Sequence, residues 1–321
     1  MPDTLRTVKA RAAKDDAIPD SSGLVGALEI GGTHVTSALV NQRAGLLVPG
    51  TLRRRSIDPH APADELVSRF ASAIAEAHAA PDVPWAIAIP GPFDYRRGIG
   101  LFTGVGKFDT LLDVNLAARL HAALPQLNGS ITFVNDAHAF AVGEWCQGAT
   151  AGAARCVGIT LGSGVGSSFL DNGTPVTAGP AVPPHGRVHR LKIGRKDLED
   201  VVSRRAILAR YLTGPDATPA TGLDVRDVFE RSRAGDEWAT RVLDEAFGAL
   251  GVALAPWLIR FEATAVAFGG AMTGSWDVIL PPLRRGLTDG GAQNDVALLR
   301  ADDTERSALV GAATSAHPVQ V

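Results

Sequence analysis

The sequence is poor in cysteine, in long hydrophobic runs and in surplus positive charge. Its two cysteines, Cys146 and Cys156, cannot build a disulfide framework, which favours a cytoplasmic setting. No apolar run approaches the roughly 18 residues that are needed to span a bilayer. The formal net charge of -3 leaves no basic excess to neutralise nucleic-acid phosphates. We therefore expect a cytoplasmic protein whose partner is neither a membrane nor a nucleic acid.

The first 22 residues lack the apolar segment of a secretory signal. They are polar and mixed in charge, so we predict a mobile tail, which is too short to be a winged-helix DNA-binding domain. The whole chain has 321 residues, of which 45% are hydrophobic. That is enough for two lobes with separate cores.

What the sequence does contain begins with a buried-strand pattern at residues 131–134, which runs directly into Asn135 and Asp136. The pattern predicts a strand that delivers an amide and a carboxylate to its C-terminal end, followed by a helix. Ligands bind at that end of strands in open α/β sheets, and a carboxylate there can accept a proton from a substrate hydroxyl. Taken alone, the pair is more often a turn or a helix cap, so its interpretation depends on other motifs.

Two glycine-rich turns supply those motifs, because residues 24–40 and 157–170 share the plan of strand, turn and strand. Adjacent glycines let backbone N–H groups approach an anion closely, and hydroxyls add donors. The repeated plan predicts a duplicated fold with the phosphates of a nucleotide between its halves. A plain hairpin turn is the alternative for either turn alone. The turn residues are Gly31, Gly32 and Thr33 in the first, and Gly162, Ser163 and Gly164 in the second.

The common nucleotide motifs are missing. Gly106 and Lys107 are followed by Phe108 and lack the upstream glycine of the Walker pattern, and no Gly-x-Gly-x-x-Gly occurs. The predicted phosphate site is therefore of neither the P-loop nor the Rossmann kind. Glu29, just before the first turn, is an unusual neighbour for phosphates unless a Mg²⁺ ion lies between them.

Hydrophobic periodicity predicts the remaining elements. Residues 90–92 should end one buried strand in a rigid loop, because two of them are proline. Gly269 and Gly270 should form a further close-approach turn after another strand. The predicted helices cover residues 64–80, 114–124, 197–211, 236–261 with a kink at Pro256, and 307–316, and the strands cover 85–89 and 263–268.

In this order, the motifs resemble those of the ROK family (repressors, open reading frames, kinases) within the actin-like ATPase superfamily. The resemblance implies an α/β fold of two ribonuclease-H-like lobes, with ATP and Mg²⁺ in the cleft between them, and a homodimer. The lobes would cover residues 23–134 and 135–305, and a terminal helix at 306–321 would return to the first lobe. The matching stretches are 29–33 and 161–166 for the phosphates, 89–92 for the sugar-side loop, 135–136 for the sugar and the catalytic base, and 269–270 for adenosine.

The resemblance also implies roles for individual residues. Asp136 would be the general base, and Asn135 and Pro92 would contact the sugar. Glu29, where the family usually has Asp, would hold Mg²⁺ through water. The cofactor-binding residues would be Gly31, Gly32, Thr33, Gly162, Ser163, Gly164, Gly269 and Gly270.

The chain departs from the family after the second phosphate motif, where the family has Gly-Glu-x-Gly-His and its Glu and His reach the sugar. Hydrophobic registration places Arg187 at the Glu and Arg190 at the His, although a shift of one residue would let His189 replace the His. A solvated basic loop is the alternative for all three. The family's cysteine-rich zinc loop is absent, so we expect no structural zinc. Glu199 matches a later family Glu that contacts sugar.

We therefore predict an ATP-dependent kinase for a hydroxyl of a sugar or a sugar-like polyol. A guanidinium only donates hydrogen bonds, so Arg187 favours a modified hexose or a C7 cyclitol over glucose. The alternatives are a plain glucokinase, a sugar-sensing regulator without turnover, and a phosphate-cleaving enzyme of the same superfamily.

Overall fold

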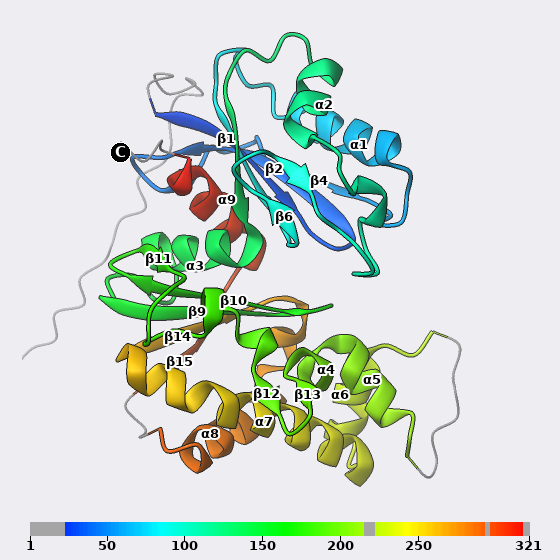
Figure 1. Cartoon of the computed structure of the whole chain (residues 1–321), viewed down its shortest axis with the longest axis vertical. Coiled ribbons are helices and arrows are strands. Elements are labelled where there is room, and N and C mark those ends of the chain that lie inside the picture. The colour runs from blue at the N-terminus through cyan, green and yellow to red at the C-terminus, as the bar shows by residue number, and fades with distance from the viewer. Residues whose placement is uncertain (1–22, 215–221, 293–295, 317–321) are drawn as a thin grey trace, which may run out of the picture.

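The computed structural model describes residues 23–214, 222–292 and 296–316. They form two lobes, each built on one main sheet (Figure 1). The mobile tail predicted for residues 1–22 lies outside the described residues.

The sheet of the N-terminal lobe opens with an antiparallel hairpin of β1 (Leu24–Ile30) and β2 (His34–Asn41). Next to β1 runs the parallel strand β5 (Trp85–Ile89), and β8 (Ile131–Asn135) pairs in parallel with β5. Every residue of β5 is buried, so its sequence is an unbroken apolar run. The short strands β3 (Leu46–Leu47) and β4 (Arg53–Ser56) extend the sheet beyond β2.

The sheet of the C-terminal lobe repeats this plan. An antiparallel hairpin of β9 (Arg155–Leu161) and β10 (Val165–Asp171) is followed by the parallel strands β14 (Ala265–Gly269) and β15 (Ala297–Arg300). The short strand β11 (Thr174–Val176) pairs with β10, as β3 does with β2. The predicted duplicated α/β fold is therefore confirmed.

Two helices lie between the sheets. α3 (Asp136–Gln147) packs on β9 and β10, α9 (Thr304–Ser315) packs on β1, β2 and β5, and the two helices contact each other along their length (Figure 1). Their backbones cross so closely that a Cβ on Gly143 would collide with the Ser307 carbonyl, and one on Gly311 with the Ala139 carbonyl. The close approach therefore requires glycine on both helices.

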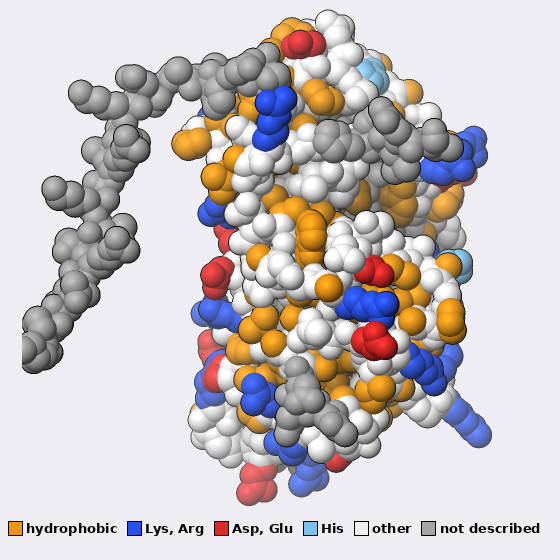
Figure 2. Space-filling model, turned by 90° about the vertical axis from the view of Figure 1, so that its left-hand side faces the viewer, with side chains coloured by type: hydrophobic (Ala, Val, Ile, Leu, Met, Phe, Trp, Pro, Cys, Tyr) orange, Lys and Arg blue, Asp and Glu red, His pale blue; other side chains and the backbone are white. Residues whose placement is uncertain are grey.

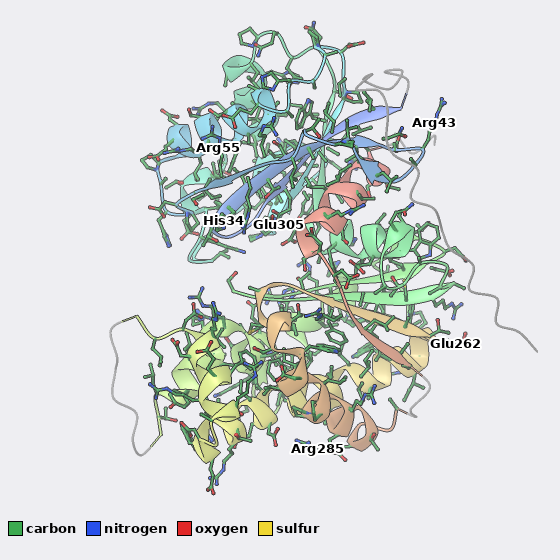
Figure 3. The ribbon with its side chains drawn as sticks, turned by 180° about the vertical axis from the view of Figure 1, so that it is seen from behind. His34, Arg43, Arg55, Glu262, Arg285 and Glu305 are labelled. Atoms are coloured by element: carbon green, nitrogen blue, oxygen red, sulfur yellow. The ribbon has the colours of Figure 1, made fainter. Side chains whose placement is uncertain are left out.

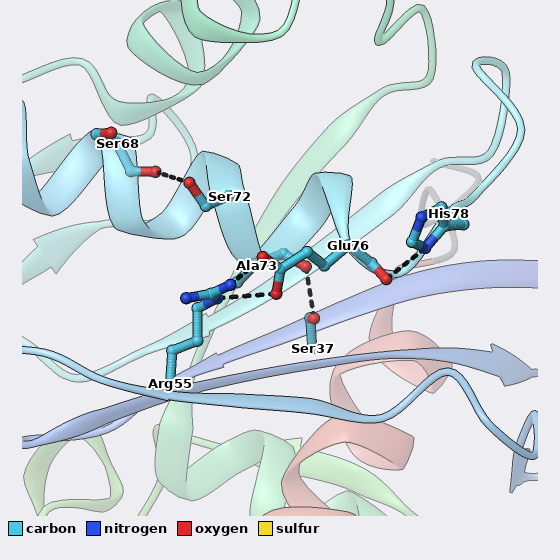
Figure 4. Close-up of polar contacts among 7 residues, drawn as sticks. All are labelled: Ser37, Arg55, Ser68, Ser72, Ala73, Glu76 and His78. Carbon is cyan, nitrogen blue, oxygen red and sulfur yellow. Dashed lines mark hydrogen bonds and ion pairs between the residues drawn. The ribbon is translucent and has the colours of Figure 1, made fainter.

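The outer face of the N-terminal sheet is covered by α1 (Ala63–Ala75) and α2 (Leu116–Ala123). The buried Ser37 hydroxyl of β2 donates to the Ala73 carbonyl at 2.6 Å, and Arg55 Nε donates to Glu76 Oε2 at 2.8 Å (Figure 4). Helix α1 is thus tied to the sheet by polar contacts in addition to its apolar side chains.

The core of the C-terminal lobe is formed by α7 (Glu237–Phe261) and α8 (Trp276–Asp289), which pack together below its sheet. By length and composition α7 could also cross a membrane, but slightly more than half of that segment is buried inside the lobe, as in the core helix of a globular protein. α7 is one continuous helix through Pro256. On the face shown in Figure 2, charged side chains of both signs are interspersed among apolar ones.

Some predicted boundaries were wrong. The helix expected over residues 197–211 is divided, because Ser203 has an extended backbone (ψ 155°) and caps a new helix by accepting from Ala206 N at 3.3 Å. α8 was not predicted, and it is helical although Pro281 and Pro282, residues that disfavour helix interiors, lie inside it.

The remaining elements are short or lie on the surface. They are β6 (Phe93–Asp94), β7 (Ile99–Gly100), η1 (Asp109–Leu111), η2 (Pro184–Gly186), η3 (Val188–Arg190), β12 (Lys192–Ile193), β13 (Lys196–Asp197), α4 (Glu199–Val202), α5 (Arg204–Tyr211), α6 (Val225–Arg233) and η4 (Ala271–Ser275).

Candidate active site

The two glycine turns face each other between the lobes. A Cβ placed on Gly32 would lie 3.8 Å from Ser163 Oγ, which is ordinary van der Waals contact. Gly31 N donates to the His34 carbonyl at 2.9 Å and so closes the first turn. Figure 3 shows His34 on the side of the N-terminal lobe that faces the C-terminal lobe. The structure therefore brings together the residues that were predicted to hold phosphates.

Asp136 is the first residue of α3 and directly follows β8. Asn135 caps this helix, because its Oδ1 accepts from Ala137 N at 3.1 Å and from His138 N at 3.2 Å. Its Nδ2 donates to Asp136 Oδ1 at 3.1 Å, and Ala137 N donates to the same oxygen at 2.9 Å. Asp136 Oδ2 makes no hydrogen bond within the described chain, so it is available to accept a proton from a substrate.

The second turn and the predicted adenosine motif adjoin this helix start. A Cβ on Gly166 of β10 would lie only 2.8 Å from the Ala137 Cβ, so β10 packs directly on the first turn of α3. Gly270, which has a φ of 94°, donates its N–H to Thr304 Oγ1 at 2.9 Å, at the start of α9. A Cβ on Gly270 would also lie 2.3 Å from the Leu161 carbonyl, so the second turn adjoins the start of α3 on one side and the Gly269–Gly270 turn on the other.

Glu29 has unusual electrostatics. The pKa of its carboxyl is raised to about 8, first by burial and then by the negative charges of Glu305 and Asp136, while Arg54 and Lys107 partly oppose the increase. This surplus of negative charge suits a divalent cation. A carboxylate is a hard oxygen ligand, and Mg²⁺ is commonly held by one or two carboxylates, waters and substrate phosphates.

The donor set thus fits a Mg²⁺ ion that is shared with a nucleotide. No cluster of three or more histidine, cysteine, aspartate or glutamate side chains that could hold a metal occurs among the residues that the structure covers. An all-protein magnesium cage is not needed in this interpretation. The expectation that the protein carries no structural zinc stays a prediction.

Glu305 is held in place by two contacts. Arg54 Nη2 lies 2.9 Å from Glu305 Oε1, and Thr36 Oγ1 donates to Glu305 Oε2 at 3.2 Å. Glu305 lies beside Glu29 because α9 packs on the first sheet, so no local sequence pattern predicted this neighbour.

The acceptor side is formed by a loop that is bound to β10. Ser167 Oγ donates to the Gly186 carbonyl at 2.6 Å and accepts from Val188 N at 3.0 Å. Arg187, between these anchors, is exposed and contributes to the lowered pKa of His138, for which burial is the main cause. The charge of Arg187 therefore acts on the first turn of α3, where the sugar site was predicted.

The other predicted acceptor residues occupy different positions. Glu199 Oε2 accepts from Val165 N at 3.0 Å, so this carboxylate braces the second turn. His189 is partly buried, and burial lowers its pKa, whereas Arg190 is exposed. Pro92 is exposed in the loop after β5.

Tyr95 and His138 are site residues that were not predicted. Tyr95 Oη accepts from Asn135 Nδ2 at 2.9 Å, and its pKa is raised by burial and by the charge of Asp136. A tyrosine three positions after Pro92 in the sugar-side loop was the only available signal. His138 lies two residues after Asp136 in α3, and burial lowers the pKa of its imidazole, which favours the neutral ring at pH 7.

Comparisons with known proteins agree with this geometry. Residues 25–318 match the model of the ROK family. The glucokinase of Thermotoga maritima is 25% identical over an alignment of 284 residues, which covers 82% of this chain and 86% of that protein. The N-acetylmannosamine kinase of Escherichia coli O157:H7 is 26% identical over an alignment of 309 residues, which covers 91% of this chain and 97% of that protein.

The chain spans only part of some relatives, such as 55% of the bifunctional enzyme NanE/NanK of Brucella melitensis biotype 1, to which it is 28% identical over 94% of its own length. Among solved structures, a ROK family glucokinase from Streptomyces griseus in complex with glucose and AMPPNP has a TM-score of 0.73. It shares 23% identity and covers 91% of this chain and 98% of its own. This likeness confirms the two-lobed fold.

Proposed function

Because the chain belongs to the ROK family, we propose that it uses ATP to phosphorylate a hydroxyl of a sugar or a sugar-like polyol. One observation carries this proposal: the free Oδ2 of Asp136 lies at the start of α3, beside the second glycine turn and close enough to raise the pKa of Glu29. A proton acceptor and a predicted phosphate site thus adjoin each other.

The reaction that fits this arrangement is a direct transfer. The acceptor oxygen attacks the terminal phosphorus of ATP, the bond from that phosphorus to the bridging oxygen breaks, and ADP leaves. The proton of the acceptor hydroxyl passes to Asp136. Asn135 holds Asp136 Oδ1 through a hydrogen bond of 3.1 Å, so the other oxygen is directed to the acceptor.

The N–H groups and hydroxyls of the two turns would hold the phosphates. Glu29 would hold Mg²⁺ through water, and the ion supplies positive charge to the phosphate chain when it is bound. Phosphoryl transfer needs mainly positioning and charge neutralisation, which these groups provide.

The acceptor side supports a substrate other than glucose. Arg187 can only donate hydrogen bonds, and the Glu199 carboxylate already accepts from Val165 N. A site with such donors suits an acceptor with a carbonyl or an altered ring end, so a modified hexose or a C7 cyclitol is favoured. Plain glucose phosphorylation remains the second candidate, because the Thermotoga maritima relative is a glucokinase.

A sugar-sensing regulator with the same fold is the alternative from another class. The free oxygen of Asp136 favours turnover, because a protein that only binds sugar needs no proton acceptor at that place. We further propose a cytoplasmic location and a homodimer. The two lobes would cover residues 23–134 and 135–305, and a helix at 306–321 would return to the first lobe. The packing of α9 on the first sheet supports that last assignment.

A coupled assay of ATP consumption against a panel of hexoses, modified hexoses and cyclitols tests the proposal. At least one acceptor should be turned over, with glucose a poor substrate. Sugar binding by calorimetry without ATP consumption on any acceptor would favour the regulator instead.

A further inference from the structure

Lys107 is a cation to which the proposed mechanism gives no role. It directly precedes Phe108, whose side chain is completely buried in the core of the N-terminal lobe, with its ring centroid 5.7 Å from that of Phe102. The preceding residues 103–106 are exposed. Lys107 therefore stands where an exposed loop enters the core, and its backbone is fixed on one side.

Two backbone hydrogen bonds connect this point to the first glycine turn. Phe108 N donates to the Pro59 carbonyl at 2.7 Å, and Ile57 N donates to the Thr33 carbonyl at 2.9 Å. Residues 57–59 thus bridge the loop of Lys107 and the turn that was predicted to hold phosphates. In agreement with this placement, the charge of Lys107 acts on Glu29 and lowers the pKa of that carboxyl.

Lys107 also differs from the arginines around it, because its charge is not committed to a partner. Arg54 is paired with Glu305 at 2.9 Å, and Arg55 with Glu76. In the parts of the chain that the structure describes, the Lys107 side chain has neither a carboxylate within 4.0 Å nor a hydrogen bond. A lysine of intermediate exposure that has no such partner and acts on Glu29 beside the first turn suits an anionic ligand.

We propose that Lys107 contacts the terminal phosphate of bound ATP, the group that is transferred. This inference rests on the proposed kinase function. The second glycine turn and the Gly269–Gly270 turn belong to the C-terminal lobe, whereas Lys107 reaches the site from the N-terminal lobe, on the side of Glu29. Lys107 therefore meets the end of the phosphate chain and not the nucleoside. Its ammonium group donates to that phosphate and neutralises charge while the bond to the bridging oxygen breaks.

The test compares two nucleotides that differ by that phosphate. Calorimetry with Mg²⁺ measures the Kd of ADP and of AMPPNP for the full chain and for Lys107→Met. We expect AMPPNP to bind about tenfold to a hundredfold more weakly to the variant, the range for losing one charge-assisted hydrogen bond. ADP binding should change less than twofold. Lys107→Gln is a second variant, and thermal unfolding checks that each is folded.

Lys192→Met is the matched control, because it removes an exposed lysine that lies in the C-terminal lobe and pairs with Asp197. It should leave both affinities unchanged. Equal weakening of ADP and AMPPNP by Lys107→Met, or weakening of neither, would overturn the inference. So would a raised KM for the acceptor with unchanged AMPPNP binding. If the wild type binds no nucleotide at all, the proposed kinase function itself is wrong.

Discussion

The two glycine turns occupy equivalent places in the two lobes, but each has its carboxylate in a different position. Glu29 lies in β1, two residues before Gly31, whereas β9 has Thr160 two residues before Gly162. The carboxylate at the second turn comes from elsewhere in the chain: Glu199, at the start of α4, accepts from Val165 N at 3.0 Å.

This difference indicates that the two halves of the duplicated fold have separate tasks. The raised pKa of Glu29 shows that burial and the charges of Glu305 and Asp136 disfavour its ionised form, so a cation beside it would be favoured. Glu199 uses its charge to hold the backbone of a turn, so it is suited to positioning. Substitutions at the first turn should therefore change how stability and nucleotide binding depend on metal and pH. Substitutions at the second turn should change the affinity for the nucleotide itself.

The largest effect is expected at Asp136, which lies beside both turns and belongs to neither. Asp136→Asn should lower kcat by about two to four orders of magnitude, because the amide cannot accept the proton. The change is nearly isosteric, so thermal unfolding should be little altered. A variant with more than about a tenth of the wild-type kcat would remove Asp136 from the mechanism.

The second turn should not tolerate a side chain at Gly164. A Cβ there would lie 2.7 Å from Glu199 Oε2, so the carboxylate that braces the turn would be displaced. We expect Gly164→Ala to raise the KM for ATP about tenfold, with little effect on the KM for the acceptor. Gly32→Ala should cost less, because among the described residues only Ser163 Oγ would lie within 4 Å of its Cβ, at 3.8 Å.

Adding Glu199→Ala to Gly164→Ala tests the cause. The double variant should lose less than the sum of the two single variants, since residues in contact are not additive. Strict additivity would show that Glu199 does not brace the turn.

Glu29, beside the first turn, should make the stability of the apoprotein depend on pH. The pKa of the Glu29 carboxyl is raised from 4.5 to about 8, so the folded apoprotein binds more protons than the unfolded chain between these values. The contribution of Glu29 to the free energy of unfolding is therefore fully present at low pH and is lost as the pH rises towards 8. Glu29→Gln should raise the Tm of the apoprotein at pH 8.5, where the wild-type carboxyl is ionised, but not at pH 4.5, where the folded wild type keeps it protonated.

Cation binding beside Glu29 should release a proton, because the positive charge of an ion held through water favours the ionised carboxyl. The affinity for Mg²⁺-AMPPNP should therefore increase with pH up to about 8, and Glu29→Gln should flatten this dependence. An unchanged pH profile in Glu29→Gln would place the cation elsewhere.

A smaller effect is expected at Arg187, in the loop beside the second turn. Arg187→Glu should raise kcat/KM for glucose, relative to that for the preferred acceptor, about tenfold, because a carboxylate can accept from sugar hydroxyls. Arg195→Glu, an exposed position between β12 and β13, is the control for net charge. Efficient use of glucose by the wild type would show that Arg187 lies outside the acceptor site.

Removal of zinc should have no effect. The loop that would hold it in the family has no cysteine here, so dialysis against a chelator followed by Mg²⁺ should restore full activity. One tightly bound zinc per chain by elemental analysis would contradict this prediction.

The sequence by itself determined the parts of the protein that depend on neighbouring residues. Alternating and continuous apolar runs predicted both hairpins and the core helix α7, and the glycines predicted the turns that we propose to hold phosphates. The juxtaposition of Asn135 and Asp136 at a strand end followed from the same local pattern, because a helix cap needs only residues close in sequence.

Only the tertiary structure decided which distant charges meet. Glu305 lies beside Glu29 because α9 packs on the first sheet, and Tyr95 meets Asn135 because β5 and β8 are parallel neighbours. Glu199 accepts from Val165 N in the second turn, 34 residues away in the sequence, and its predicted contact with the sugar stays a prediction. Electrostatic and hydrogen-bond interactions depend on distance in space, and the packing of the two lobes sets those distances independently of separation along the chain.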